Sequence, residues 1–143
     1  MDVALVIRQR LEKFGLDQRE LAQAAEVTES YISQLLTRRK APPAPSRTDI
    51  YDKMDKFLKL PSGELARLAA VRRDPRVSLL VDEWSEDWSR LWWVRAEGRA
   101  RVADLDAAVA ARLAAKYPQY RAEPPGGPMI EIAVERWTGW SAA

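Results

Sequence analysis

Apolar residues recur at helical spacing through most of the first half of the chain. A first helix is expected from a row of apolar positions three or four residues apart: Val3, Ile7, Leu11 and Phe14. Gly15 follows this row and is typical of a helix end. A second helix is expected over about 18–25, because Asp17 and Glu20 have the spacing of a capping box. The chain therefore starts with two short helices separated by a tight turn.

A third helix is predicted over 28–37, with one apolar and one polar face. Thr28 is in the N-cap position, and the apolar face consists of Ile32, Leu35 and Leu36. The other face carries small or polar side chains: Glu29, Ser30, Ser33, Gln34 and Thr37. The basic run 38–40 follows directly. A polar helix face beside a basic run suits the major groove and phosphates of DNA.

Two further helices complete the first half. The stretch 41–46, APPAPS, predicts a stiff loop. Thr48 is expected to cap a helix whose apolar positions are Ile50, Met54, Phe57 and Leu58. Pro61 ends that stretch, and a fifth helix is expected from Ser62 to about Val71.

From Arg76 onward the period of the pattern changes to that of β-strands. Residues 76–82 predict one strand, and 91–102 alternate between apolar and polar side chains as a second. Gly98 interrupts this alternation and predicts a bulge or bend. A helix capped by Asp104 and ended by Pro118 comes next, and 129–137 predict a final strand. The expected fold class is α+β, with a five-helix domain over 1–72 and a β/α segment over 73–143.

Charge and composition exclude several kinds of site. The 143 residues have a formal charge of +2, and the basic excess belongs to residues 1–72. The absence of Cys and His excludes a Cys/His zinc site, thiol chemistry and imidazole catalysis. No apolar run approaches the ~20 residues of a membrane span, and the N-terminus has no signal-peptide pattern. We therefore expect a cytoplasmic protein with no membrane partner.

The stretch 16–36 resembles the helix-turn-helix of the Cro and lambda-repressor-like (XRE) regulators. Gln18 and Ala22 match the start and the small-residue site of that family's second helix, and Val27, Thr28, Ile32 and Ser33 fit its order. Glu26 departs from the pattern, because the family usually carries Gly in the turn. The resemblance covers about half of the chain and implies a five-helix DNA-binding domain.

The first hypothesis is therefore a sequence-specific DNA-binding transcriptional regulator without a cofactor. Its partner would be double-stranded DNA, with the helix 28–37 in the major groove and the C-terminal sheet pairing two copies as a homodimer. The residues expected at the DNA are Gln18, Thr28, Glu29, Ser30, Tyr31, Ser33, Gln34, Thr37, Arg38, Arg39 and Lys40. No catalytic residue is expected.

A second resemblance covers residues 65–143. The stretch 74–102, the segments KYPQYR and PPGGP, and the closing ERWTGWSA are similar to the C-terminal part of the pyridoxamine-phosphate-oxidase-like flavin/deazaflavin split barrels. The family's opening strands, which supply much of its phosphate site, have no counterpart here. The resemblance implies a partial split-barrel-like antiparallel sheet with one helix. It also implies that Arg136, Trp137 and Trp140 can approach a cofactor across a dimer.

The alternative hypothesis is accordingly an oxidoreductase-like protein that binds flavin mononucleotide or a deazaflavin. Three strands cannot close a barrel, so either dimerisation or packing against the helices is expected to cover the sheet. The acidic cluster of Asp82, Glu83, Glu86 and Asp87 has no metal-site spacing and is interpreted as a solvated loop. No metal site is expected.

Overall fold

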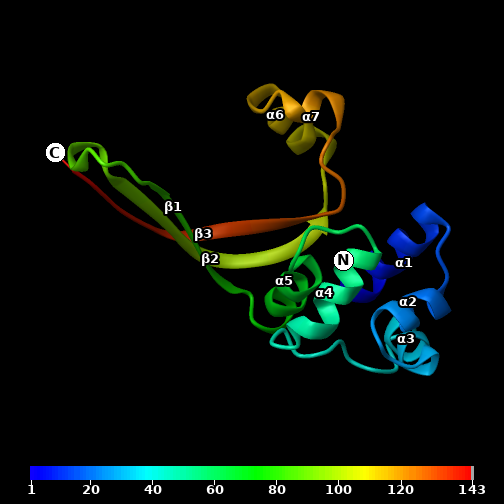
Figure 1. Ribbon diagram of the computed structural model, residues 1–143. Helices are drawn as coiled ribbons and strands as arrows, with labels where there is room; N and C mark the ends of the chain where they lie inside the picture. Colours follow the sequence, from blue (N-terminus) through cyan, green and yellow to red (C-terminus); the bar gives the residue numbers. More distant parts are fainter. Residues whose placement is uncertain (143) are drawn as a thin grey trace.

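Residues 1–142 are described by the computed structural model, in which a helical body is followed by a long antiparallel sheet (Figure 1). The body consists of five helices: α1 (Val3–Phe14), α2 (Gln18–Ala24), α3 (Glu29–Leu36), α4 (Thr48–Phe57) and α5 (Glu64–Arg73). All five agree with the helices predicted from the apolar pattern. The sheet extends away from the body in Figure 1, and the C-terminus lies near its far tip.

The starts of α2 and α3 follow the sequence closely. The Asp17 carboxylate accepts from the Glu20 amide at 2.7 Å, and the Glu20 carboxylate accepts from the Asp17 amide at 3.0 Å. This confirms the capping box. Thr28 caps α3 by accepting from the Tyr31 amide at 3.1 Å. Glu26, in the turn between the helices, has a left-handed backbone with a φ of 56°, a conformation that costs about 1 kcal/mol without glycine.

Two other predicted caps are wrong. Thr48 is the first residue of α4, and the N-cap residue Arg47 makes no side-chain capping bond. Asp104 is the last residue of a strand, and Asp106 caps the next helix by accepting from the Ala108 amide at 2.6 Å. The helix starts therefore differ from the predicted positions by one or two residues: α4 begins at Thr48 itself, and Asp106 takes the capping role that was predicted for Asp104.

The apolar faces of the five helices meet in one core. Its fully buried side chains come from every helix and include Ile7, Leu21, Ile32, Met54 and Leu65. The Tyr51 hydroxyl is tied down by donating to the Pro43 carbonyl at 2.7 Å, which holds the proline-rich loop against α4. The helical body therefore has its own hydrophobic core.

One acidic residue is buried in this body. Asp55 is 1% exposed and its Oδ1 accepts from the Leu65 amide at 3.2 Å. The N-cap of α5 is Gly63, which has no side chain to cap the helix. Asp55 on α4 therefore supplies the missing acceptor, and burial raises the pKa of its carboxyl group above the usual value of 3.8.

The second half of the chain forms an antiparallel sheet, with three strands in the described residues. These are β1 (Arg76–Glu83), β2 (Trp92–Asp104) and β3 (Pro128–Ser141), in the order β1-β2-β3. A short 3-10 turn, η1 (Trp88–Arg90), lies between β1 and β2. Helices α6 (Ala107–Lys116) and α7 (Gln119–Ala122) connect β2 to β3 and lie above the sheet in Figure 1. The α+β class and the partial antiparallel sheet agree with the prediction; α7 was not predicted.

The predicted irregularity at Gly98 is a bulge. The pairing of β2 with β3 shifts between Glu97 and Gly98, so that Glu97 faces Arg136 and Gly98 faces Val134. A Cβ atom on Gly98 would lie 2.1 Å from the Ala133 carbonyl oxygen. Only glycine allows the two backbones to approach this closely.

The bulge lies where the sheet meets the helical body. Helix α5 packs against β2, the side chain of Val102 contacts the helical core, and the Ala100 amide donates to the Pro75 carbonyl at 2.7 Å. The predicted domain boundary between 72 and 73 falls at the end of α5. The division into two domains stays a prediction.

The two faces of the sheet differ in chemistry. Paired residues share a face, so one face carries the ion pairs Arg99–Glu135, Arg101–Glu131 and Arg136–Glu97, and we call it the ion-pair face. The other, the apolar face, carries side chains that are at least one-third exposed: Leu79, Val81, Trp92, Ile130, Val134 and Trp137. In the described part of the chain nothing covers the outer part of the apolar face.

A first prediction concerns the bulge. Gly98→Ala is expected to lower the free energy of unfolding by about 2 kcal/mol, because the new methyl group must displace the Ala133 carbonyl. Urea denaturation measures this change. Gly126→Ala is the matched control, because a Cβ there meets no atom within 4 Å, and it should stay within about 0.5 kcal/mol of the parent. Equal stability of the two variants would contradict the close pairing of β2 and β3.

A second prediction concerns the pH dependence of stability. The raised pKa means that folded Asp55 keeps its proton to a higher pH than unfolded Asp55. The contribution of this carboxyl group is therefore fully present below the usual pKa and is lost as pH rises through the folded pKa. Asp55→Asn keeps an oxygen for the Leu65 amide but does not titrate.

The free energy of unfolding of Asp55→Asn, relative to the parent, should therefore rise as the pH increases through and above the usual carboxyl pKa of 3.8. Urea denaturation at several pH values measures the free energy of unfolding of both proteins. If the difference between Asp55→Asn and the parent stayed constant with pH, the burial of this carboxylate would be contradicted. Glu12→Gln, an exposed change on α1, serves as the control.

Candidate functional site

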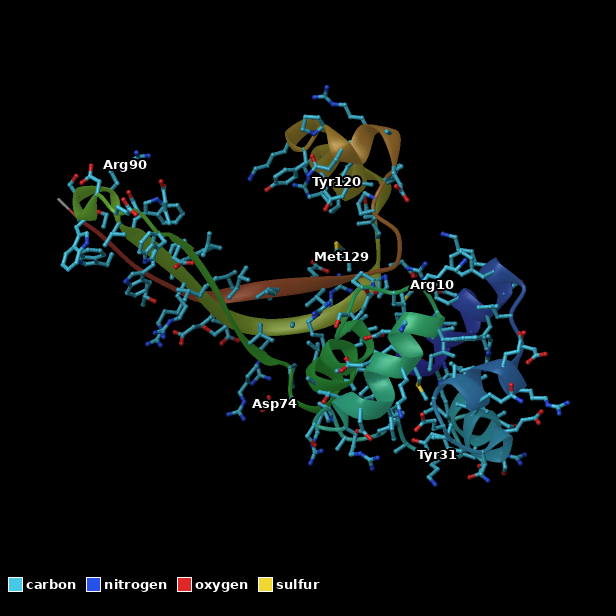
Figure 2. All side chains as sticks on the ribbon, in the orientation of Figure 1. Arg10, Tyr31, Asp74, Arg90, Tyr120 and Met129 are labelled. Carbon is cyan, nitrogen blue, oxygen red and sulfur yellow. The ribbon has the colours of Figure 1, made fainter. Side chains whose placement is uncertain are left out.

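A cleft of about 430 Å³ lies at the outer end of the sheet, where the turn between β1 and β2 meets β3. Its wall contains four tryptophans, two aliphatic residues and three charged residues: Trp84, Trp92, Trp93, Trp140, Leu80, Leu91, Asp82, Glu83 and Arg95. Figure 2 labels Arg90, which lies at this tip of the sheet. The volume lies within the range of small-molecule sites.

Strand register brings the main walls together. Trp93 lies directly opposite Asp82 on β1 and opposite Trp140 on β3. Two residues further along, Leu80, Arg95 and Thr138 are paired across the three strands in the same way. All of these side chains belong to the ion-pair face. Trp92 and Glu83, which also line the cleft, are paired with each other on the apolar face, so the cleft lies at the outer tip of the sheet.

The turn between β1 and β2 is held by its own hydrogen bonds. The Asp87 carboxylate accepts from the amide and hydroxyl of Ser89 at 3.1 and 2.6 Å, and these bonds lower the pKa of Asp87. The Trp92 indole donates to the Glu83 carboxylate at 2.8 Å, and Arg90 lies 3.4 Å from the same carboxylate. These contacts fix Trp92 and the edge of the cleft.

Two polar atoms next to the cleft have no hydrogen-bond partner among residues 1–142. They are Nε of Arg95 and Oγ1 of Thr138, both buried and directly opposite each other in the strand register. A buried donor without an acceptor costs about 1–3 kcal/mol. The guanidinium of Arg95 is otherwise held only by a distant contact of 3.6 Å with Glu97. Of the two residues, only Arg95 is among those that line the cleft. Its side chain is 41% exposed, so the guanidinium is the group that can donate to a ligand.

The predicted cofactor residues are not brought together. Trp140 lines the cleft. Arg136 lies on the ion-pair face and donates to Glu97 at 2.6 Å, whereas Trp137 pairs with Ala96 on the apolar face and is 66% exposed. The cofactor role of these three residues stays a prediction. Arg95 and Thr138 were missed, although the alternation of 91–102 already placed Trp93 and Arg95 on one face.

Most of the residues predicted to contact DNA are exposed on or near α3, but several are bound within the protein. The Arg38 guanidinium pairs with Asp2 at 2.8 Å, and the Lys40 ammonium lies 4.8 Å from the centre of the Tyr31 ring. Tyr31 is half-buried, and the other predicted residues are exposed: Gln18, Thr28, Glu29, Ser30, Ser33, Gln34, Thr37, Arg38, Arg39 and Lys40. Among them, Ser30 accepts from Gln34 at 3.2 Å, and Thr37 donates to the Ser33 carbonyl at 2.8 Å.

Other kinds of site were searched for in the described residues. Within 1–142, no three acidic side chains lie close enough together to bind a metal ion. None of the helices in this part of the chain combines the length and the apolar composition needed to cross a membrane.

Comparison with known proteins gives one match. The family model for pyridoxamine 5'-phosphate oxidase matches residues 20–141. No curated protein matches the chain. The family match starts in α2 and ends at the last residue of β3, so it includes most of the helical body as well as the sheet.

This match overturns the first hypothesis. The prediction of a sequence-specific DNA-binding regulator is wrong, because the matched family is that of the alternative and the match includes the helix 28–37. Capping boxes, a small residue between helices and a polar outer face occur in any compact helical bundle. The match supports the split-barrel resemblance and gives no support to the resemblance to XRE regulators.

Proposed function

This chain belongs to the pyridoxamine 5'-phosphate oxidase family, and we propose that it binds the planar ring of a flavin or deazaflavin in the aromatic cleft. The observation that carries the proposal is the position of Arg95 among the four tryptophans that line the cleft. Aromatic walls with a few polar groups are typical of sites for planar ligands.

The ring of a flavin fits the chemistry of this cleft. The tryptophan side chains offer apolar surface for stacking, and the ring's carbonyl oxygens are acceptors that match a guanidinium donor. The phosphate of flavin mononucleotide finds no comparable site, because the cleft carries Asp82 and Glu83 and only one cation, Arg95. The proposal therefore concerns the ring.

A bound flavin or deazaflavin supplies hydride transfer. The residues of this chain would hold the ring and exclude water from it, with Trp93 and Trp140 as walls and Arg95 as the donor to a ring oxygen. We assign no catalytic acid or base to the cleft.

We also propose that the protein is a homodimer formed through the apolar face. The accessible surface of the chain is 9708 Å², whereas a folded monomer of this size exposes roughly 7,500 Å². The excess of about 2,000 Å² is comparable to the surface that each subunit of an obligate homodimer buries. The apolar face, with Trp137 and Leu79 more than half exposed, is the part of the sheet that a second copy can cover without burying charges.

The cofactor proposal predicts the effect of removing the cation from the cleft. Arg95→Gln should weaken binding of riboflavin about ten-fold, because one charge-assisted hydrogen bond to the ring is lost. Quenching of flavin fluorescence on titration of the purified protein measures the affinity. Arg112→Gln, an exposed change on α6, is the matched control and should leave the affinity unchanged.

The same titration tests the proposal as a whole. Saturable binding of riboflavin, flavin mononucleotide or a deazaflavin supports it. If none of the three binds, the proposed function is wrong. Equal affinities of the two arginine variants would place the ring elsewhere on the protein.

The dimer proposal predicts a change of mass in solution. Trp137→Ser should shift the protein from dimer to monomer in sedimentation equilibrium, because it removes the largest exposed apolar side chain of the apolar face. Trp88→Ser removes a more exposed tryptophan, at 79%, from the turn between β1 and β2, and should leave the mass unchanged. A parent protein that is monomeric at all concentrations would contradict the dimer.

A further inference from the structure

We propose that the aromatic cleft selects flavins without a phosphate, so that riboflavin binds more tightly than flavin mononucleotide. This inference rests on the proposed flavin binding and adds the class of flavin to it. The basis is the charge around the cleft, which is acidic where a phosphate would have to lie.

The acidic groups belong to β1 and to the turn that follows it. Asp82 and Glu83 line the cleft, and Glu86 and Asp87 come next in the turn. The carboxylate of Asp82 makes no hydrogen bond or ion pair with any residue in 1–142. Its charge is therefore not compensated by a neighbour.

The basic groups do not balance this charge. Arg90 pairs with Glu83 at 3.4 Å, and Arg95 lies on the floor of the cleft. Residues 82–95 thus carry four carboxylates and two guanidinium groups, which gives a net charge of −2. Further along the same face, Glu97 is paired with Arg136, so that this pair adds no net charge.

A phosphate brings a further charge of about −1.5 to −2 at pH 7. The ribityl chain of a flavin is short, so the phosphate of a ring-bound cofactor stays close to the edge of the cleft. At roughly 10 Å in water, repulsion from a net charge of −2 weakens binding about ten-fold. The neutral ribityl hydroxyl of riboflavin avoids this repulsion and can donate to Asp82 or Glu83.

The test compares the two flavins on the full-length protein by fluorescence titration. Riboflavin is expected to bind about ten-fold more tightly at low salt. The difference should disappear at about 0.5 M salt, where the repulsion is screened. Asp82→Asn should strengthen binding of flavin mononucleotide about three-fold relative to that of riboflavin. Asp52→Asn, which removes one carboxylate from α4 in the helical body, should change neither affinity.

The outcomes separate this inference from the proposed function. If flavin mononucleotide binds as tightly as riboflavin or more tightly, or if its affinity falls as salt rises, the selectivity is wrong and flavin binding stands. If Asp82→Asn changes both affinities equally, the carboxylate does not face the phosphate and the inference is again wrong. If neither flavin binds, the proposed function itself is refuted.

Discussion

The rest of the structure depends on the close packing around β2, which has a neighbouring strand along each edge and a helix against one face. β2 pairs with β1 along one edge and with β3 along the other, and α5 packs against it. A strand in this position has room only for small residues, and Ala96, Gly98 and Ala100 are buried in sequence along the apolar face. Gly98 is the extreme case, because its missing side chain lets the β3 backbone bend across the bulge. The helical body and the sheet are joined through this row of small side chains.

The same arrangement leaves a sheet with two unequal faces. Near the helical body the apolar face is covered, since Val102 contacts the helical core. Further out it carries exposed Leu79, Val81 and Trp137. The opposite face is solvated through ion pairs, and becomes apolar only at its outer end, in the cleft. Large apolar sheet faces are rarely left uncovered in water. This is the reason for proposing a second copy of the chain on one face and a ligand on the other.

The local parts of this fold could be predicted from the sequence, and the long-range parts could not. The capping box at Asp17 and Glu20 and the cap at Thr28 depend on residues within a few positions of one another, and both are present. The cleft depends on the register of three strands, and register pairs Arg95 with Thr138 across 43 positions of sequence. The incorrect assignment to DNA-binding regulators has the same origin. The features that α2 and α3 share with a helix-turn-helix are local, whereas the family match extends across both halves of the chain.

Strand parity explains why the predicted cofactor residues do not form one site. Side chains alternate between the faces of a strand, so residues an odd number of positions apart point to opposite sides. Trp137 and Trp140 are three positions apart, and the register places Trp137 beside Ala96 and Trp140 beside Trp93. No bulge lies between them, so the two tryptophans point to opposite faces of the sheet. Trp140 lines the cleft, and Trp137 lies on the face that a second copy would cover. A substitution of Trp140 should therefore affect ligand binding alone, and a substitution of Trp137 should affect assembly alone. If both residues belonged to one cofactor site, either substitution would affect ligand binding.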